Sequence, residues 1–126
     1  MKYFLVIFSA LLLAACTSPN KNLQNLETRN RVQKFLDEYN NEYQRLYTLS
    51  SEAQWKTNTY IRKGDTLTSK ATDEAAKAMA DYTGSQKVID SVQAYLKIKD
   101  VLTDLQVKEL NTLLYTAANN PESMKD

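Results

Sequence analysis

Residues 35–47 read FLDEYNNEYQRLY, and the apolar side chains in this stretch recur at every third or fourth position. That spacing places them along one face of an α-helix, whereas a half-buried strand would alternate apolar and polar residues. The stripe extends in both directions, so the pattern predicts one amphipathic helix from about Leu26 to Asn58. Its apolar positions are Val32, Phe35, Leu36, Tyr39, Tyr43, Leu46, Tyr47 and Ala53.

A second long helix is predicted after a short turn. Gly64 ends the first helix, because glycine is the residue that most readily leaves a helical conformation. The second helix begins at about Thr66 or Asp73 and continues to Lys99, with Gly84 in its middle lowering its stability by ~1 kcal/mol relative to alanine. Because only a short turn joins the two helices, the second is expected to run antiparallel to the first.

A third, shorter helix is predicted over Asp104–Ala118. Thr103 and Gln106 have the spacing of a capping box, in which each side chain satisfies a backbone N–H of the other residue. Pro121 stops the helix, and residues 120–126 are expected to be a disordered tail. With only two Gly and two Pro in 126 residues, the expected fold is all-α: two long antiparallel amphipathic helices plus a shorter third helix, preceded by a signal-peptide helix.

The N-terminal segment reads MKYFLVIFSALLLAAC over residues 1–16. A lysine, an apolar run too short for a comfortable membrane span and small residues before Cys16 resemble the signal peptide and lipobox of bacterial lipoproteins. The resemblance implies a lipoprotein signal peptide over 1–15 and a polar tether over 16–25. The chain would then be anchored to a membrane of the bacterial cell envelope, on the periplasmic or outer side, through the lipidated Cys16. The alternative is an ordinary signal peptide followed by an incidental cysteine.

The composition excludes several classes of chemistry. The chain contains no histidine, so it cannot build a Ser-His or Cys-His nucleophile pair, a histidine-based catalytic zinc site or an HExxH motif. A single cysteine excludes an internal disulfide. The 16 basic and 15 acidic residues are nearly balanced, which gives no electrostatic reason to expect binding to nucleic acid. The sequence therefore predicts no cofactor held by this chain.

Residues 52–61, EAQWKTNTYI, carry a family resemblance. With residues 35–47 they resemble the angiotensin-converting-enzyme-like family of zinc peptidyl-dipeptidases, and its bacterial members in particular. The family pattern is E-A-x-W-x-x-N-T-x-I, and the likeness extends over about residues 27–118. The family often has an aromatic residue at the position of Thr57 and an asparagine at that of Gln54. The matching residues are Glu52, Ala53, Trp55, Asn58, Thr59 and Ile61.

The resemblance implies a lid. In the family the first helices cross the mouth of a deep cleft and admit short, flexible peptides, while the zinc-binding HExxH motif lies far downstream. Residues 26–119 are thus interpreted as the lid-like N-terminal segment of a lipid-anchored peptidyl-dipeptidase, which removes C-terminal dipeptides. Zinc belongs to the full-length family and not to this chain, which is expected to be inactive alone. Its expected partners are the missing catalytic region or short peptides.

Individual side chains have competing interpretations. Gln54 and Asn58 are the residues that the resemblance turns toward the cleft, although Asn58 could instead cap the end of its helix. Trp55 is interpreted mainly as a packing anchor, with a place at the cleft mouth as the alternative. Glu38 and Glu42 are expected to form a solvated charged face rather than an acid/base pair. For the whole chain, the alternative function is a small self-contained helical envelope lipoprotein that acts as an interaction or structural module.

Overall fold

The computed structural model describes residues 20–119, and this part of the chain is helical without strands. The all-α prediction is confirmed. The predicted signal-peptide helix, Cys16 and the predicted tail over 120–126 lie outside the described residues. The helices are α1 (Lys21–Thr59), α2 (Leu67–Thr83), α3 (Gln86–Leu96), the short 3₁₀ helix η1 (Lys99–Val101) and α4 (Asp104–Asn119).

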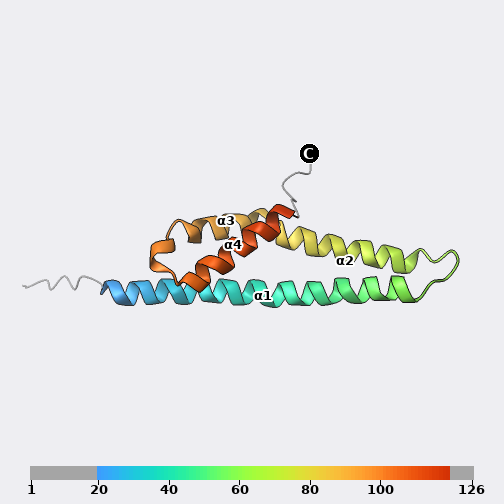
Figure 1. Ribbon diagram of the computed structural model, residues 1–126, viewed down its shortest axis with the longest axis horizontal. Coiled ribbons are helices and arrows are strands. Elements are labelled where there is room, and N and C mark those ends of the chain that lie inside the picture. The colour runs from blue at the N-terminus through green and yellow to red at the C-terminus, as the bar shows by residue number, and fades with distance from the viewer. Residues whose placement is uncertain (1–19, 120–126) are drawn as a thin grey trace, which may run out of the picture.

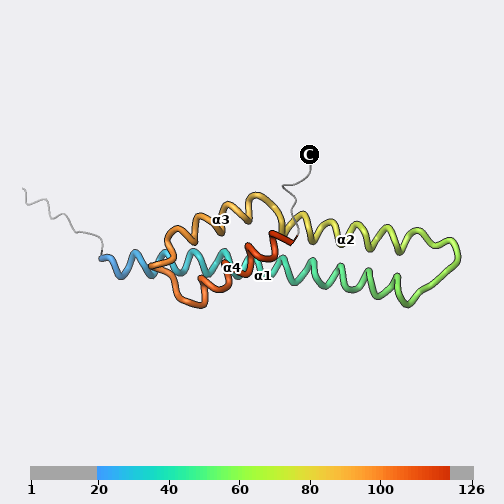
Figure 2. The backbone as a smooth tube through the Cα atoms, turned by 45° about the horizontal axis from the view of Figure 1, so that its top comes forward, coloured from blue at the N-terminus to red at the C-terminus, as the bar shows by residue number. Residues whose placement is uncertain are grey.

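The first helix determines the length of the molecule. α1 contains 39 residues, which corresponds to about 58 Å at the usual rise per residue. α2 returns antiparallel to it, α3 continues in the same general direction, and α4 crosses obliquely in front of α1 and α3 (Figure 1). The turn between α1 and α2 therefore lies at one end of the molecule, and Lys21 lies at the other (Figure 2).

α1 begins at Lys21, whereas the sequence pattern placed residues 21–25 in the polar tether. The reason is a local cap: the Asn20 side chain accepts a hydrogen bond of 3.0 Å from the backbone N–H of Asn22. Asparagine is a favoured N-cap because its side-chain oxygen satisfies one of the free N–H groups of the first turn. The first helical turn thus forms without any apolar stripe.

The second predicted helix is bent into α2 and α3 at Gly84 and Ser85. The Ser85 hydroxyl accepts a hydrogen bond from the N–H of Val88 at 3.4 Å and so caps α3. Gly84 is buried at the junction, next to Thr83, which has no exposed surface. The bend lets α3 follow α1 while α4 packs beside it.

The hydrophobic core lies at the Lys21 end of the molecule, here called the proximal half. α1, α3 and α4 meet there around four fully buried side chains, and a tilted Phe35–Tyr95 ring pair with centroids 5.2 Å apart closes one side. Burial of such side chains contributes about 1.5–3 kcal/mol each. The buried core residues are Val32, Leu36, Tyr39, Val88, Val92, Leu102, Leu110 and Leu113.

The predicted capping box joins α4 to this core. The N–H of Thr103 donates to Gln106 Oε1, and the N–H of Gln106 donates to Thr103 Oγ1, both at 3.2 Å. The prediction for these two residues is confirmed. Gln106 is only 4 % exposed, because its amide group also reaches α1.

The other end of the hairpin has a different construction. Residues 47–82, here called the distal arm, comprise the last turns of α1, the turn and nearly all of α2, and none of these residues is buried. Its described cross-helix hydrogen bonds come from Thr57, whose hydroxyl lies 3.0 Å from the Thr68 carbonyl oxygen and 2.7 Å from the Thr72 hydroxyl. A two-helix contact of this kind leaves most side chains in contact with water. Within residues 20–119, no helix combines the length and apolar character that a membrane span requires.

Candidate interaction surface

Trp55 lies on the side of α1 that faces away from α2. Ala53 and Thr57 are half-buried against α2, and a residue two positions away is turned by about 200° around a helix. Trp55 is accordingly 70 % exposed. It does not act as a packing anchor among residues 20–119, because α1 has no neighbour on that side at this height.

Gln54 and Asn58 are both exposed and lie four residues apart, on one flank of α1. Tyr47 precedes Gln54 by seven residues, or about two turns, so it lies on the same flank. Tyr60, not Asn58, occupies the C-cap position of α1. The structure thus brings the two amides that the sequence singled out into one strip with Tyr47, on the solvent-facing surface of the distal arm.

The tyrosines of α1 pass from the core to this strip. Tyr39, Tyr43 and Tyr47 stack in series with ring centroids 6.1 and 6.2 Å apart, and Tyr82 stacks on Tyr39 at 5.3 Å. Tyr39 is 4 % exposed and Tyr47 is 57 % exposed. The series therefore packs in its first part, as the i, i+4 spacing predicted, and is open at Tyr47.

Burial changes the chemistry of the inner tyrosines. It raises the pKa of Tyr39 to about 12, and the neighbouring Tyr82 and Tyr43 add to the shift. Burial also raises the pKa of Tyr82, with smaller contributions from Glu42 and Glu38. Within residues 20–119, the Tyr39 hydroxyl is buried without a hydrogen-bond partner. These phenols stay protonated at neutral pH and are not poised for acid/base chemistry.

The acidic residues of α1 belong to a charged outer face, as predicted. Glu42 receives two hydrogen bonds from the Arg45 guanidinium, at 2.8 and 2.6 Å, and this contact lowers the pKa of its carboxyl group. Glu38 lies 3.7 Å from the Lys34 ammonium, with both side chains mostly exposed. Exposed ion pairs at helical spacing solubilise a helix and contribute about 0–1 kcal/mol.

The turn between α1 and α2 carries apolar and basic side chains together. Tyr60 is 55 % exposed, Ile61 87 % and Leu67 78 %. The Arg62 guanidinium lies over the Tyr60 ring, 4.4 Å from its centroid, and donates a hydrogen bond of 2.5 Å to its hydroxyl. Sequence reasoning treated this turn only as a connection. The signal that could have identified it is the run YIRK, in which two apolar residues precede two basic ones.

The Asp65 carboxylate caps the N-terminus of α2. Asp65 Oδ1 accepts hydrogen bonds from the N–H groups of Leu67 and Thr68, at 2.9 and 3.3 Å. These backbone hydrogen bonds, the one from Thr68 first, lower the pKa of Asp65. Its negative charge is directed into the helix terminus, while Gly64 supplies the positive φ of 81° that the turn requires.

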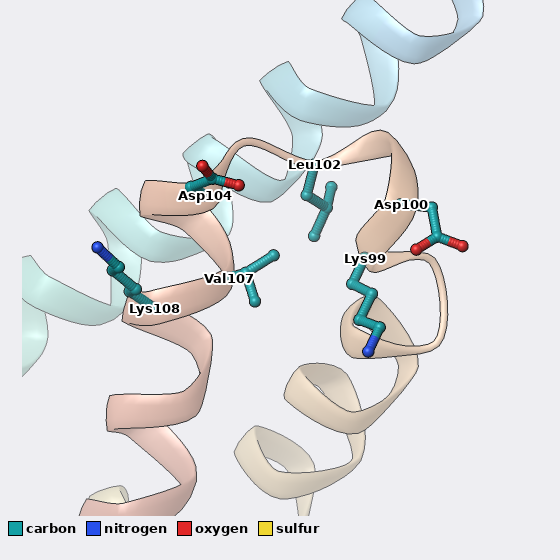
Figure 3. A pocket seen from close by; sticks show the side chains of 6 residues that line it. All are labelled: Lys99, Asp100, Leu102, Asp104, Val107 and Lys108. Carbon is teal, nitrogen blue, oxygen red and sulfur yellow. The ribbon is translucent and has the colours of Figure 1, made fainter.

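A shallow open hollow of about 440 Å³ lies between η1 and α4. In Figure 3 the Leu102 and Val107 side chains approach one another across it, while Lys108 points away. Polar groups do not converge on a common point inside it, which is what a binding or catalytic pocket would need. The residues around the hollow are Lys99, Asp100, Leu102, Asp104, Val107 and Lys108.

The residues present do not fit a catalytic zinc ion. The sequence contains no histidine, and within residues 20–119 no cluster of three or more potential metal-ligating side chains occurs. Catalytic zinc sites use three protein ligands, in which histidine predominates. Any chemistry that needs zinc would have to be supplied from outside these residues.

No protein-family model, no curated protein and no solved structure matches the chain.

Proposed function

We propose that this chain is a non-catalytic helical lid for a lipid-anchored zinc peptidyl-dipeptidase. The distal arm covers the mouth of a cleft in a separate catalytic region, and Gln54 and Asn58 face the short peptides that enter. The chain supplies no zinc ligand and does not hydrolyse peptides by itself. The resemblance of residues 52–61 to the family block motivates the peptidase part of the proposal.

The observation that carries the proposal is the contrast between the two halves of the hairpin. The distal arm contains no buried residue, yet it presents Trp55 at 70 % exposure and Tyr47 at 57 %. Large exposed apolar side chains that gather on one part of a molecule are typical of surfaces that contact a partner. Trp55 is also a conspicuous member of the block, so this exposed residue and the family pattern coincide.

A second candidate function is favoured by the proximal half. Val32, Leu36, Val92 and Leu110 are fully buried there, so this half forms a closed core of its own. A closed core suits a self-contained envelope lipoprotein that presents the distal arm to a partner unrelated to peptidases. The two candidates differ in what the distal arm contacts.

Site-directed photocrosslinking separates these candidates. A photoreactive phenylalanine analogue replaces Asn58 in the full chain, in the cells that produce it, and the crosslinked peptides are identified by mass spectrometry. Under the lid proposal, position 58 crosslinks to a polypeptide region that contains an HExxH motif. The matched control is the same analogue at Ala94, an exposed position on α3, which should not give this product.

A crosslink from position 58 only to a protein without a zinc motif would contradict the lid proposal and favour the second candidate, and the absence of any crosslinked protein would contradict both. An assay of the purified chain gives an independent check. With zinc added, the chain should release no dipeptide from short peptides. Zinc-dependent turnover by the 126 residues alone would overturn the assignment of catalysis to another region. The coding sequence beyond Asp126 and in neighbouring genes can be searched for HExxH at little cost.

A further inference from the structure

The outermost part of the distal arm combines a convex shape with apolar side chains. The turn between α1 and α2 lies at the far end of the molecule from Lys21 (Figure 1). Tyr60, Ile61 and Leu67 are each more than half exposed there. The hollow at this turn, lined by Thr59, Tyr60, Ile61 and Arg62, measures only about 260 Å³. Ligand pockets usually measure about 300–1,000 Å³, so the apolar side chains of the turn suit a broad, yielding surface better than a small ligand.

Basic residues are concentrated in the same part of the chain. Residues 55–70 contain four basic residues and a single acidic one, Asp65. The rest of the described chain, residues 20–54 and 71–119, has ten basic and twelve acidic residues. Lys70 is paired with Glu74 at 3.6 Å, so the positive excess at the outer end of the arm comes from the other three basic residues, while the remainder of the chain is slightly negative. The basic residues are Lys56, Arg62, Lys63 and Lys70.

Local contacts fix the positions of the charged groups at the turn. The Asp65 carboxylate is turned into the N-terminus of α2, where two backbone N–H groups bind it. Arg62 lies over the Tyr60 ring, so its charge is held next to an aromatic side chain. Aromatic rings with a polar end settle at the boundary between lipid tails and headgroups, and basic residues beside them attract anionic headgroups.

We propose that the turn formed by residues 60–67 binds the surface of an anionic lipid membrane. Ile61 and Leu67 enter the headgroup region, Tyr60 lies at its boundary, and Arg62 and Lys63 contact the lipid phosphates. The complementary charge of the surface is the reason to prefer a membrane to a protein partner for this turn. Gln54, Asn58 and Trp55 precede the turn on α1 and remain available to the catalytic region that the proposed lid covers.

This contact would set the orientation of the molecule. α1 spans about 58 Å between Lys21 and the turn. A chain anchored only near its N-terminus could stand away from the membrane, whereas binding at the turn as well makes α1 lie along the surface. The inference goes beyond the lid proposal, because it concerns residues 60–67 and lipid rather than a peptidase region.

Fluorescence quenching tests the proposal directly. The chain has a single tryptophan, which can be moved to the turn by the paired substitutions Trp55→Phe and Ile61→Trp. The full chain, purified from membranes, is reconstituted into vesicles whose lipids carry brominated acyl chains, which quench a nearby tryptophan. Quenching of residue 61 is expected in vesicles of phosphatidylglycerol and phosphatidylcholine, and much less in phosphatidylcholine alone. Native Trp55 provides a second reporter in the unaltered chain.

Charge removal supplies the matched variants. Arg62→Gln with Lys63→Gln should lower the equilibrium constant for the quenched state about tenfold or more. The control variant, Lys97→Gln with Lys99→Gln, removes the two charges that flank Ile98 at the other end of the molecule. It should leave quenching unchanged. Salt that shortens the Debye length to about 3 Å should release the turn.

Three results would overturn the proposal: equal quenching in both kinds of vesicle, quenching that survives the Arg62 and Lys63 substitutions, or no quenching in either vesicle. None of these results bears on the crosslink from position 58, so this proposal and the lid proposal fail separately.

Discussion

The side-chain amide of Gln106 donates a hydrogen bond of 2.9 Å to the backbone carbonyl oxygen of Arg29, 77 positions earlier in the chain. The Arg29 side chain in turn contacts η1, because its Nε donates a hydrogen bond of 2.6 Å to the Val101 carbonyl oxygen. Gln106 also caps α4 through Thr103. One residue therefore ends a loop, begins a helix and fixes that helix against α1. Such a buried polar arrangement specifies how the helices meet.

The first prediction concerns this residue. Gln106→Ala should lower the free energy of unfolding by about 1–3 kcal/mol, because it removes half of the capping box and the contact with Arg29 together. Chemical denaturation followed by circular dichroism measures the change. Gln93→Ala, on the exposed surface of α3, is the matched control and should stay within about 0.5 kcal/mol of the wild type. Equal effects of the two substitutions would contradict the role assigned to Gln106.

The second prediction tests which face of α4 packs against the core. Leu110 is fully buried, whereas Leu105 in the same helix is 64 % exposed. Leu110→Ala should lower the free energy of unfolding by about 2–5 kcal/mol, because it leaves a cavity among Leu36, Val92 and their neighbours. Leu105→Ala makes the same chemical change and should have little effect. If the exposed leucine proved as costly to remove as the buried one, α4 would have to pack through another face.

Much of the fold follows from the sequence because its signals are local. The apolar stripe around residues 35–47 predicts α1, and the Thr103–Gln106 pair predicts the start of α4. The bend at Gly84 was marked by its glycine, but the capping role of Ser85 in starting a new helix needs the structure. Asn20 likewise begins α1 by a side-chain cap, which an argument based on apolar periodicity does not detect.

The candidate surface was harder to predict because exposure depends on what packs beside a helix. Trp55 lies in an amphipathic pattern, where a tryptophan is usually buried, yet among residues 20–119 α1 has no neighbour on that side. Gln54 and Asn58 were singled out by a family resemblance and not by any physical signal. The importance of the turn at residues 60–67 emerged only when the exposure of Ile61 and Leu67 could be set beside the charges of Arg62 and Lys63.

The third prediction concerns the stability of the distal arm. The Thr57 hydroxyl bridges α1 to α2 through Thr68 and Thr72, in a region without buried side chains. Thr57→Ala should speed amide hydrogen exchange in α1 and α2 around these residues. The free energy of global unfolding should change by less than about 1 kcal/mol. Hydrogen exchange with mass spectrometry resolves the two effects.

The control for this prediction is Thr48→Ala. The Thr48 hydroxyl bonds to the Gln44 carbonyl oxygen within α1 and does not reach α2. Exchange in α2 should therefore remain at the wild-type rate in this variant. In the unaltered protein, residues 47–82 should already exchange faster than the helices of the proximal half. Uniform protection along the whole hairpin would show that the distal arm is as stable as the core.

The last prediction follows from the buried phenol of Tyr39. Its pKa is raised from 10.0 to about 12, so between these pH values the unfolded chain loses this proton while the folded chain keeps it. The unfolded state then binds fewer protons, and stability falls as pH rises. The contribution is fully present below pH 10 and is lost progressively up to pH 12. Each pKa unit corresponds to about 1.4 kcal/mol, and Tyr82 acts in the same direction.

Tyr39→Phe isolates this contribution. The hydroxyl it removes has no hydrogen-bond partner in the described part of the chain, so the free energy of unfolding at neutral pH should stay level or rise by up to about 1 kcal/mol. The alkaline loss of stability should become shallower, with Tyr82 accounting for part of what remains. Tyr47→Phe removes a hydroxyl from an exposed ring and should keep the full wild-type slope. Denaturation across the alkaline range, with tyrosinate absorbance recorded in parallel, measures both quantities. A steep alkaline limb that persists in Tyr39→Phe would place the responsible proton on another group whose pKa is raised in the folded state.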